Sequence, residues 1–380
     1  MGAIELAQEL IKLNTGNPPG NESRVADVVE KRLRQAGYEV ERIEHAAGRA
    51  NLIAKWDGGP GKTLVIHGHM DTIPAGQGWV HNPFGAVIEK GRLYGRGACD
   101  MKGGLASIVV ALENLKKGGW RPRGKLIFAA SANEEMGDTD EIGMRAVANR
   151  LKEIAGKDGL LVLGDTTDFN ITVAEKGVLW LEVISHGKEA HGSTPWKGIN
   201  AIEKLGKFLI ALNNTEFTIN HPLLGRSTIS INTISGGYKT NAVPESAKAT
   251  LDIRLVPGDS KESVMGKIKD LAAKMRKEDN DMSLEFKEIT YLDPVESPAK
   301  QAFVPMLKSV VKETTGKEAV VLGEHGSTGA SMFAKNTGLH TVACGPGRPE
   351  QAHTKDEWIE TRDIDAGVKF FEALAKKYLA

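Results

Sequence analysis

Apolar and polar residues alternate along the first half of the chain in a way that predicts helices and strands in turn. Ile4, Ala7 and Leu10 recur at helical spacing, and similar patterns predict helices over residues 22–37 and 101–117. Around these helices lie short apolar runs of strand length, namely YEVERI, NLIAKW, KTLVIHG, KLIFAAS and DGLLVLGD. This order of elements predicts an α/β fold with a mostly parallel sheet.

Three of the apolar runs end at acidic or imidazole side chains. KTLVIHG runs into His69, KLIFAAS is followed by Glu134 and Glu135, and DGLLVLGD ends on Asp165. Ligands of mostly parallel sheets bind beyond the carboxyl ends of the strands. The pattern therefore predicts a site at that edge of the sheet.

The middle of the chain follows a different pattern, β-α-β-β-α-β, which is typical of the ferredoxin-like module. Its strands and helices are predicted, in order, at VLWLEVISHG, GINAIEKLGKFLIALNN, STISINTISGG, SAKATLDIRLV, SKESVMGKIKDLAAKMRKE and MSLEFKEI. We therefore expect an inserted α+β domain at residues 175–291. Residues 1–174 and 292–380 would together form the α/β domain that carries the site. A chain of 380 residues is long enough for two such domains.

Composition and charge limit the class of partner. Hydrophobic residues make up 41% and charged residues 26% of the chain, the balance of an ordinary globular protein. The 49 basic residues equal the 49 acidic ones and no basic run stands out, so we expect no binding to nucleic acid or to a membrane surface. No apolar stretch approaches the ~18 residues of a membrane span, and no signal peptide is visible. A small molecule or a short peptide is the expected partner.

The two cysteines, Cys99 and Cys344, are too few for a disulfide framework. This count indicates a reducing compartment, so the sequence predicts a cytoplasmic protein. Cys99 adjoins an acidic residue, but we interpret its thiol as a small buried apolar group.

Five side chains in separate segments form a set that suits two divalent metal ions. They are His69 in HGHMDT, Asp100 in GRGACDMKGG, Glu135 in SANEEMG, Asp165 in LVLGDTTD and His353 in EQAHTKDEW. Imidazole and carboxylate groups without a thiolate favour zinc, with cobalt or manganese as alternatives.

A pair of metal ions needs one bridging carboxylate and terminal ligands on both sides. Asp100 is the candidate bridge, because the small residues around it let the backbone approach a crowded centre. We expect His69 and Asp165 to complete the shell of one ion. Glu135 and His353 would complete the shell of the other.

Two further acids adjoin these candidate ligands. Asp71, two residues beyond His69, is placed to accept the spare imidazole N–H and fix its tautomer. Glu134 precedes Glu135, and on an extended segment the two carboxylates would point in different directions. Glu134 would then take a proton from the attacking water and pass it to the leaving amine. A His-x-Asp alone is more often a surface or core pair than a metal site, and a Glu-Glu pair is usually a solvated face. The agreement of five segments nevertheless favours a hydrolytic metal site.

These residues stand in stretches that resemble the M20 family of metallopeptidases and amidohydrolases. The matching stretches, in family order, are HGHMDTIPAG, GRLYGRGACDMKGGLAS, ANEEMG, AHGSTPWKGINAI, TNAVPESAKATLDIRLVPG and GPGRPEQAHTKDEWI. The resemblance covers the chain from about Asn51 to its end. It implies the same roles for the five ligands, for Asp71 and for Glu134. It also implies a cis peptide bond between Asp100 and Met101.

The resemblance implies roles for the inserted domain as well. In the family this domain acts as a lid and a dimerisation module. Its histidine, here His191, reaches the active site of the other subunit and stabilises the oxyanion. Asn241 and Arg254 match positions that hold a substrate carboxylate in many members. Gly326 and Ser327 match another such segment. The resemblance therefore implies a substrate with a carboxylate group, and the role of the inserted domain implies a homodimer.

Three functions remain open from the sequence. The leading hypothesis is a metal-dependent N-acyl amino acid deacylase of the acetylornithine deacetylase or succinyl-diaminopimelate desuccinylase type. The second is a dipeptidase or exopeptidase, such as a carboxypeptidase, with the same centre. The third is a catalytically inactive binding module, which is disfavoured because every candidate ligand and Glu134 are present.

Overall fold

The computed structural model describes residues 2–137, 142–298 and 300–380 and divides into two compact units. Unit 1 comprises Met1–Val173, Glu296–Leu322 and Thr328–Ala380, and unit 2 comprises Ala174–Val295 and Gly323–Ser327. The short segment Gly323–Ser327 belongs to unit 2, whereas the sequence pattern placed it in the α/β domain.

The main sheet is mixed, with parallel strands at its centre, as the sequence predicted. Its strands are β1 (Glu39–Ala46), β2 (Arg49–Asp57), β3 (Thr63–His69), β6 (Lys125–Ser131), β7 (Gly159–Leu163), β8 (Ile171–Glu175), β15 (Val295–Glu296), β16 (Val321–Glu324) and β17 (His340–Ala343). Their order is β1-β2-β6-β3-β7-β17-β8-β15, with β16 paired to β8. Strands β6, β3, β7 and β17 run parallel, while β1 and β2 extend the sheet in antiparallel pairing.

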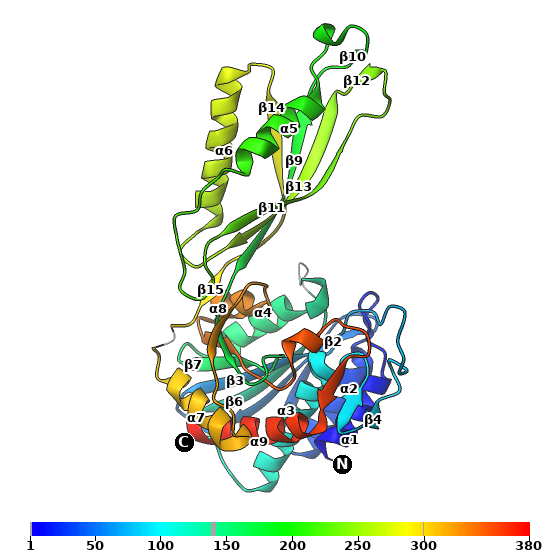
Figure 1. Cartoon of the computed structure of the whole chain (residues 1–380). Coiled ribbons are helices and arrows are strands. Elements are labelled where there is room, and N and C mark those ends of the chain that lie inside the picture. Colours follow the sequence, from blue (N-terminus) through cyan, green and yellow to red (C-terminus); the bar gives the residue numbers. More distant parts are fainter. Residues whose placement is uncertain (1, 138–141, 299) are drawn as a thin grey trace. The chain divides into compact units, whose positions relative to one another are not determined.

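Helices cover both faces of this sheet (Figure 1). They are α1 (Ala3–Lys12), α2 (Ser23–Gln35), α3 (Gly103–Lys117), α4 (Met144–Ile154), α7 (Phe303–Thr315), α8 (Ala330–Thr337) and α9 (Thr361–Tyr378). Helices α1, α3, α7 and α9 pack on one another on one face, and α4 packs against α8 on the other. Every residue of β3 is buried, as expected for a strand covered on both sides. No helix in the described part of the chain is both long and apolar enough to cross a membrane.

The structure corrects two local expectations near the candidate site. The helix expected from residue 101 begins at Gly103, because the preceding turn Ala98–Lys102 has extended backbone angles at Asp100. Glu134–Met136 forms a 3-10 turn rather than an extended segment. Asn133 has a φ of 60°, in the left-handed region, so the backbone leaves the extended conformation just before that turn.

Several short elements were not predicted, because they carry too few residues for a periodic pattern. A small sheet of order β18-β5-β4 joins β4 (Val87–Glu89), β5 (Arg92–Tyr94) and β18 (Trp358–Glu360). It pairs the segment before Asp100 with the segment after His353.

Unit 2 has the predicted β-α-β-β-α-β order. Its elements are β9 (Gly177–His186), α5 (Ala201–Leu212), β11 (Thr228–Gly236), β13 (Ser246–Leu255), α6 (Lys261–Glu278) and β14 (Ser283–Leu292), with a short pair β10 (Ala190–His191) and β12 (Ala242–Val243). The antiparallel strand order β11-β13-β9-β14 is that of a ferredoxin-like sheet.

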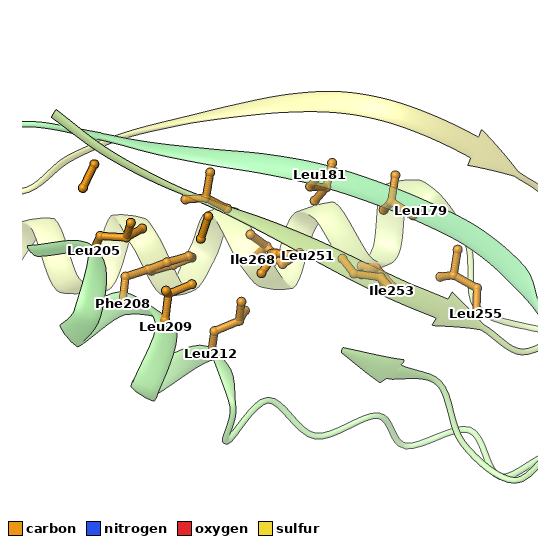
Figure 2. Close-up of a cluster of buried hydrophobic side chains, with 14 of the residues drawn as sticks. Leu179, Leu181, Leu205, Phe208, Leu209, Leu212, Leu251, Ile253, Leu255 and Ile268 are labelled. Carbon is orange, nitrogen blue, oxygen red and sulfur yellow. The ribbon is translucent and has the colours of Figure 1, made fainter. Parts of the chain in front are cut away.

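Both helices of unit 2 pack on one face of its sheet (Figure 2). Phe208 of α5 and Ile268 of α6 meet alternate residues of β13, including Leu251 and Ile253, and all four are almost fully buried. Helix α5 begins where the Asn200 side chain accepts the backbone N–H groups of the first turn. Unit 2 therefore has its own hydrophobic core.

Candidate metal centre

The carboxyl ends of the parallel strands bring the candidate ligands together within unit 1. His69 is the last residue of β3, and it lies in register with Ser131, the last residue of the neighbouring strand β6. Asp165 follows the end of β7 by two residues, and Glu135 stands in the turn after β6. Parallel strands share one carboxyl edge, so segments distant in sequence converge there.

Asp100 lies at the middle of this group. Its Oδ1 is 2.9 Å from His69 Nε2, and its Oδ2 is 3.4 Å from His353 Nε2. His353 Nε2 also lies 2.9 Å from Glu135 Oε2. One atom each of His69, Asp100 and Glu135 lie within 4.8 Å of one another. The Asp100 carboxylate thus has an imidazole at each oxygen, the arrangement expected of a bridge between two sites.

Asp165 and Glu134 share the same electrostatic environment. Burial raises the pKa of Asp165 to about 6, and the nearby Asp100 carboxylate adds to the shift. Burial also raises the pKa of Glu134 well above its usual range; His69 opposes that shift, while Glu135, Asp165 and Asp100 increase it. Both shifts have the same cause, since burial and neighbouring carboxylates disfavour further negative charge at this position.

The residues present fit a pair of cations. Four acidic side chains, those of Asp100, Glu134, Glu135 and Asp165, meet two imidazoles, so acidic groups outnumber basic ones at the site. Burial lowers the pKa of His69, but the carboxylates of Asp100 and Asp71 reverse the shift and raise it well above the usual value. Glu135 Oε1 is buried and has no hydrogen-bond partner among the residues that the structure describes. A cation at this position would satisfy that acceptor.

Asp71 connects His69 to the turn that carries the two glutamates. Its Oδ1 accepts the backbone N–H of Glu134 at 3.1 Å, and its Oδ2 accepts that of Glu135 at 3.2 Å. His69 Nδ1 lies 3.1 Å from the Asp71 carbonyl oxygen and 3.5 Å from its carboxylate. The imidazole therefore faces the backbone of Asp71 more closely than the side chain, which the sequence had indicated as its acceptor. The additional contact with the glutamate turn was not foreseen.

A buried polar network behind Asp71 was also missed by sequence reasoning. Asn17 donates its side-chain amide to Asp71 Oδ2 at 2.9 Å and to Asn133 Oδ1 at 2.8 Å. Arg49 donates to the fully buried Glu22 and, at 2.8 Å, to the same Asn133 oxygen. Asn17, Glu22 and Arg49 come from the first 50 positions, before the main motifs begin. No local pattern in the sequence marks these three polar residues as partners of the site.

The backbone around Asp100 agrees with the family resemblance. The Asp100–Met101 peptide bond is cis. Cys99 is fully buried, as predicted, and burial raises the pKa of its thiol well above the usual value. A neutral buried thiol packs as a small apolar group, so Cys99 is not a candidate ligand here.

The residues predicted to bind substrate all lie in unit 2, where the structure separates them into two groups. His191 and Asn241 are neighbours, since the N–H of Gly192 donates to the Asn241 carbonyl at 2.8 Å. Arg254 lies near the other end of β13, in register with Val178.

Arg254 already has an anionic partner. Its guanidinium donates to both carboxylate oxygens of Asp252, at 2.7 and 3.1 Å. The segment with Gly326 and Ser327 lies by the start of β9, because the carbonyl of Glu324 accepts the N–H of Lys176. Because Asp252 already occupies the Arg254 guanidinium, a substrate carboxylate would compete with Asp252 for it.

The chain is similar to known proteins along most of its length. The family model described as peptidase family M20/M25/M40 matches residues 65–377. A probable succinyl-diaminopimelate desuccinylase of Staphylococcus aureus (strain MSSA476) is 27% identical over 99% of this chain and 97% of its own.

Two solved structures share the fold over nearly their whole length. An M20 family metallo-carboxypeptidase from Sulfolobus solfataricus has a TM-score of 0.79 at 21% identity, covering 99% of both chains. A dinuclear metal-binding M20 peptidase of Bacillus subtilis has a TM-score of 0.75 at 17% identity, covering 99% of this chain and 97% of its own. With the family model matching most of its length, the chain belongs to the M20/M25/M40 peptidase family and is a metallohydrolase.

Proposed function

We propose that the protein is a di-metal N-acyl amino acid deacylase, which hydrolyses the amide of an acetylated or succinylated amino acid. The observation that carries this proposal is the Asp100 carboxylate with an imidazole at each oxygen and three further acidic side chains, Glu134, Glu135 and Asp165, in the same cluster. The similarity to a desuccinylase over the whole chain supports the choice of substrate.

His69, Asp100, Glu135, Asp165 and His353 would hold two divalent cations, and we propose zinc, with Asp100 as the bridge. Such ions, when bound, lower the pKa of water and polarise a carbonyl oxygen. Asp71 would keep the His69 ring and the glutamate turn in place through its contacts with both.

Glu134 would move the proton. Its backbone N–H is fixed by Asp71 Oδ1, and its side chain lies among the charges of the cluster. The carboxylate would take a proton from the attacking water and deliver it to the nitrogen of the leaving amine. Because water itself would attack the carbonyl carbon and the C–N bond would then break, no covalent intermediate with the chain would form.

We further propose that unit 2 pairs two copies of the chain and that His191 and Asn241 act on the active site of the other copy. The register places Ser246 opposite His186 and Arg254 opposite Val178, so eight residues, ~26 Å of strand, separate the two groups. Such a separation is too large for His191 and Arg254 to hold the same small substrate within one copy. Arg254, Gly326 and Ser327 would bind the substrate carboxylate.

The exposed face of α5 and the edge strand β11 support pairing. Ile210 is 73% exposed on α5, and Ile234 is 60% exposed on β11. Strand β11 lies at the end of its sheet, so a second copy could cover its outer edge. We also propose a cytoplasmic setting, in keeping with two buried free thiols.

The alternative is a dipeptidase or carboxypeptidase with the same centre, which the name of the similar Sulfolobus structure favours. The deciding experiment strips the purified protein with a chelator and reloads it with zinc, cobalt or manganese. Rates are then compared for N-acetyl amino acids, N-succinyl amino acids and dipeptides. Faster metal-dependent release from the acylated amino acids supports the deacylase, and faster dipeptide cleavage supports the peptidase. No metal-dependent rate on any of them would refute both.

A further inference from the structure

A fully buried carboxylate outside the predicted ligand set, that of Glu357, is surrounded by hydrogen-bond donors of the turn that carries Asp100. Glu357 Oε1 accepts the backbone N–H groups of Cys99 at 2.8 Å and Asp100 at 2.9 Å. Its Oε2 accepts the N–H of Gly97 at 3.1 Å and the guanidinium of Arg96 at 2.6 Å. All four donors lie within five consecutive residues, so one side chain fixes the whole approach to Asp100.

This turn needs such an anchor because its backbone forms no regular ladder. Gly97 has a φ of 83°, a left-handed conformation that glycine adopts readily. A side chain there would meet Thr72 at 2.7 Å, so no larger residue fits. Successive N–H groups that converge in this way form a concave site for an anion, and here the anion is part of the protein.

The segment that supplies Glu357 also supplies His353, only four residues earlier. His353 approaches the Asp100 carboxylate, with Nε2 at 3.4 Å from Oδ2, while Glu357 holds the Asp100 backbone N–H. Asp356, between them, accepts the N–H groups of Val80 and His81 and so attaches the same segment to another loop. One short segment thus contacts Asp100 at its backbone and at its side chain.

We propose that Glu357 is a positioning residue, which sets the place of the bridging carboxylate Asp100 relative to His69 and His353. The inference rests on the proposed di-metal function and names a residue outside its ligand set. Glu357 touches neither substrate nor ion in this scheme; it acts only through the backbone of residues 97–100.

The matched test compares Glu357→Gln with Glu113→Gln. Glutamine keeps the size, but its NH2 group must face backbone or guanidinium donors that now lack an acceptor. Glu113 is also a nearly buried carboxylate paired with an arginine, Arg32, at 2.7 Å, and it is not part of the site. Both variants should lower thermal stability, so the loss of stability alone does not distinguish them.

The distinguishing measurement is zinc affinity, from competition between the purified full chain and a chromogenic chelator. We expect Glu357→Gln to bind zinc about 10–100-fold more weakly than the parent, as for other residues that orient metal ligands. With saturating zinc its kcat should fall by a similar factor while KM changes less than about twofold. Glu113→Gln should keep the parent's zinc affinity and kcat.

Parent-like zinc affinity in Glu357→Gln, or an equal loss in Glu113→Gln, would overturn the inference. If Glu357→Gln does not fold, Glu357→Asp takes its place, because it keeps the charge but shortens the side chain by one methylene. We expect weaker zinc binding for this variant too, and parent-like zinc affinity would again overturn the inference. A parent chain that binds no zinc would instead refute the proposed function. The two failures are therefore distinguishable.

Discussion

Replacing Asp71 by asparagine tests how the candidate ligands are held. The Asp71 side chain is fully buried, and its carboxylate accepts two backbone N–H groups and the Asn17 amide. Burial raises the pKa of this carboxyl, but hydrogen bonds from His69, Asn17 and the backbone of Glu135 reverse the shift and hold it below the usual value. The group is therefore ionised at neutral pH, and asparagine removes its charge without changing its size.

The cost follows from the contacts. The amide NH2 loses least when it takes the Oδ1 position, which leaves the buried N–H of Glu134 without an acceptor, a cost of about 1–3 kcal/mol. The two donors that remain, on Glu135 and Asn17, lose a charged acceptor, about 1 kcal/mol each. The free energy of unfolding should fall by about 3–5 kcal/mol.

The glutamate turn and the His69 ring lose their common support at the same time. We expect kcat to fall at least about 100-fold, equivalent to about 2.7 kcal/mol. Urea unfolding of the metal-free chain measures the first effect, and steady-state kinetics with saturating metal measures the second. Glu113→Gln controls for the loss of a buried carboxylate elsewhere. Asp71→Asn with the parent's stability and kcat would refute the reasoning.

Other predictions concern single steps of the account. Glu134→Gln should lower kcat by about 10²–10⁴-fold with unchanged metal content by elemental analysis; an active variant would remove Glu134 as the proton carrier. His191→Ala should lower kcat about 100-fold or more without changing metal content, whereas a parent-like rate would count against oxyanion stabilisation. Ile210→Glu should convert a dimer to a monomer in sedimentation, and a monomeric parent with full activity would contradict action between copies. Burial and the neighbouring His69 lower the pKa of His67 to about 3, so the unfolded chain binds a proton first as the pH falls below about 6.5. The free energy of unfolding should therefore decrease from pH 6.5 towards pH 3. At pH 5, His67→Gln should show about 2 kcal/mol less of this decrease than the parent. If the urea midpoints of the parent and of His67→Gln shift equally with pH, His67 is not the cause.

Sequence patterns were sufficient for the elements that carry strong periodicity or end in a polar group. His69 and Asp165 could be placed at the edge of the sheet because buried strands read as continuous apolar runs. The order of elements also predicted the ferredoxin-like module of unit 2, in which β9 pairs with β13 and β14.

The supports of the site could not be found in this way, since they depend on contacts between distant positions. Asn17 meets Asn133 across 116 residues, and Glu357 meets Asp100 across 257. The turn at Glu134 differs from the extended form expected because Asn133 adopts a left-handed conformation, which asparagine tolerates but does not require. The spacing of apolar and polar residues does not reveal which distant side chain will accept a hydrogen bond from a given backbone N–H.

The most direct measurement of the central claim is an anomalous diffraction map of the crystallised chain, recorded after chelator treatment and reloading with zinc. We expect two peaks ~3.5–4 Å apart, with Asp100 between them and His69, Asp165, Glu135 and His353 around them. A single peak, or peaks away from these five side chains, would contradict it.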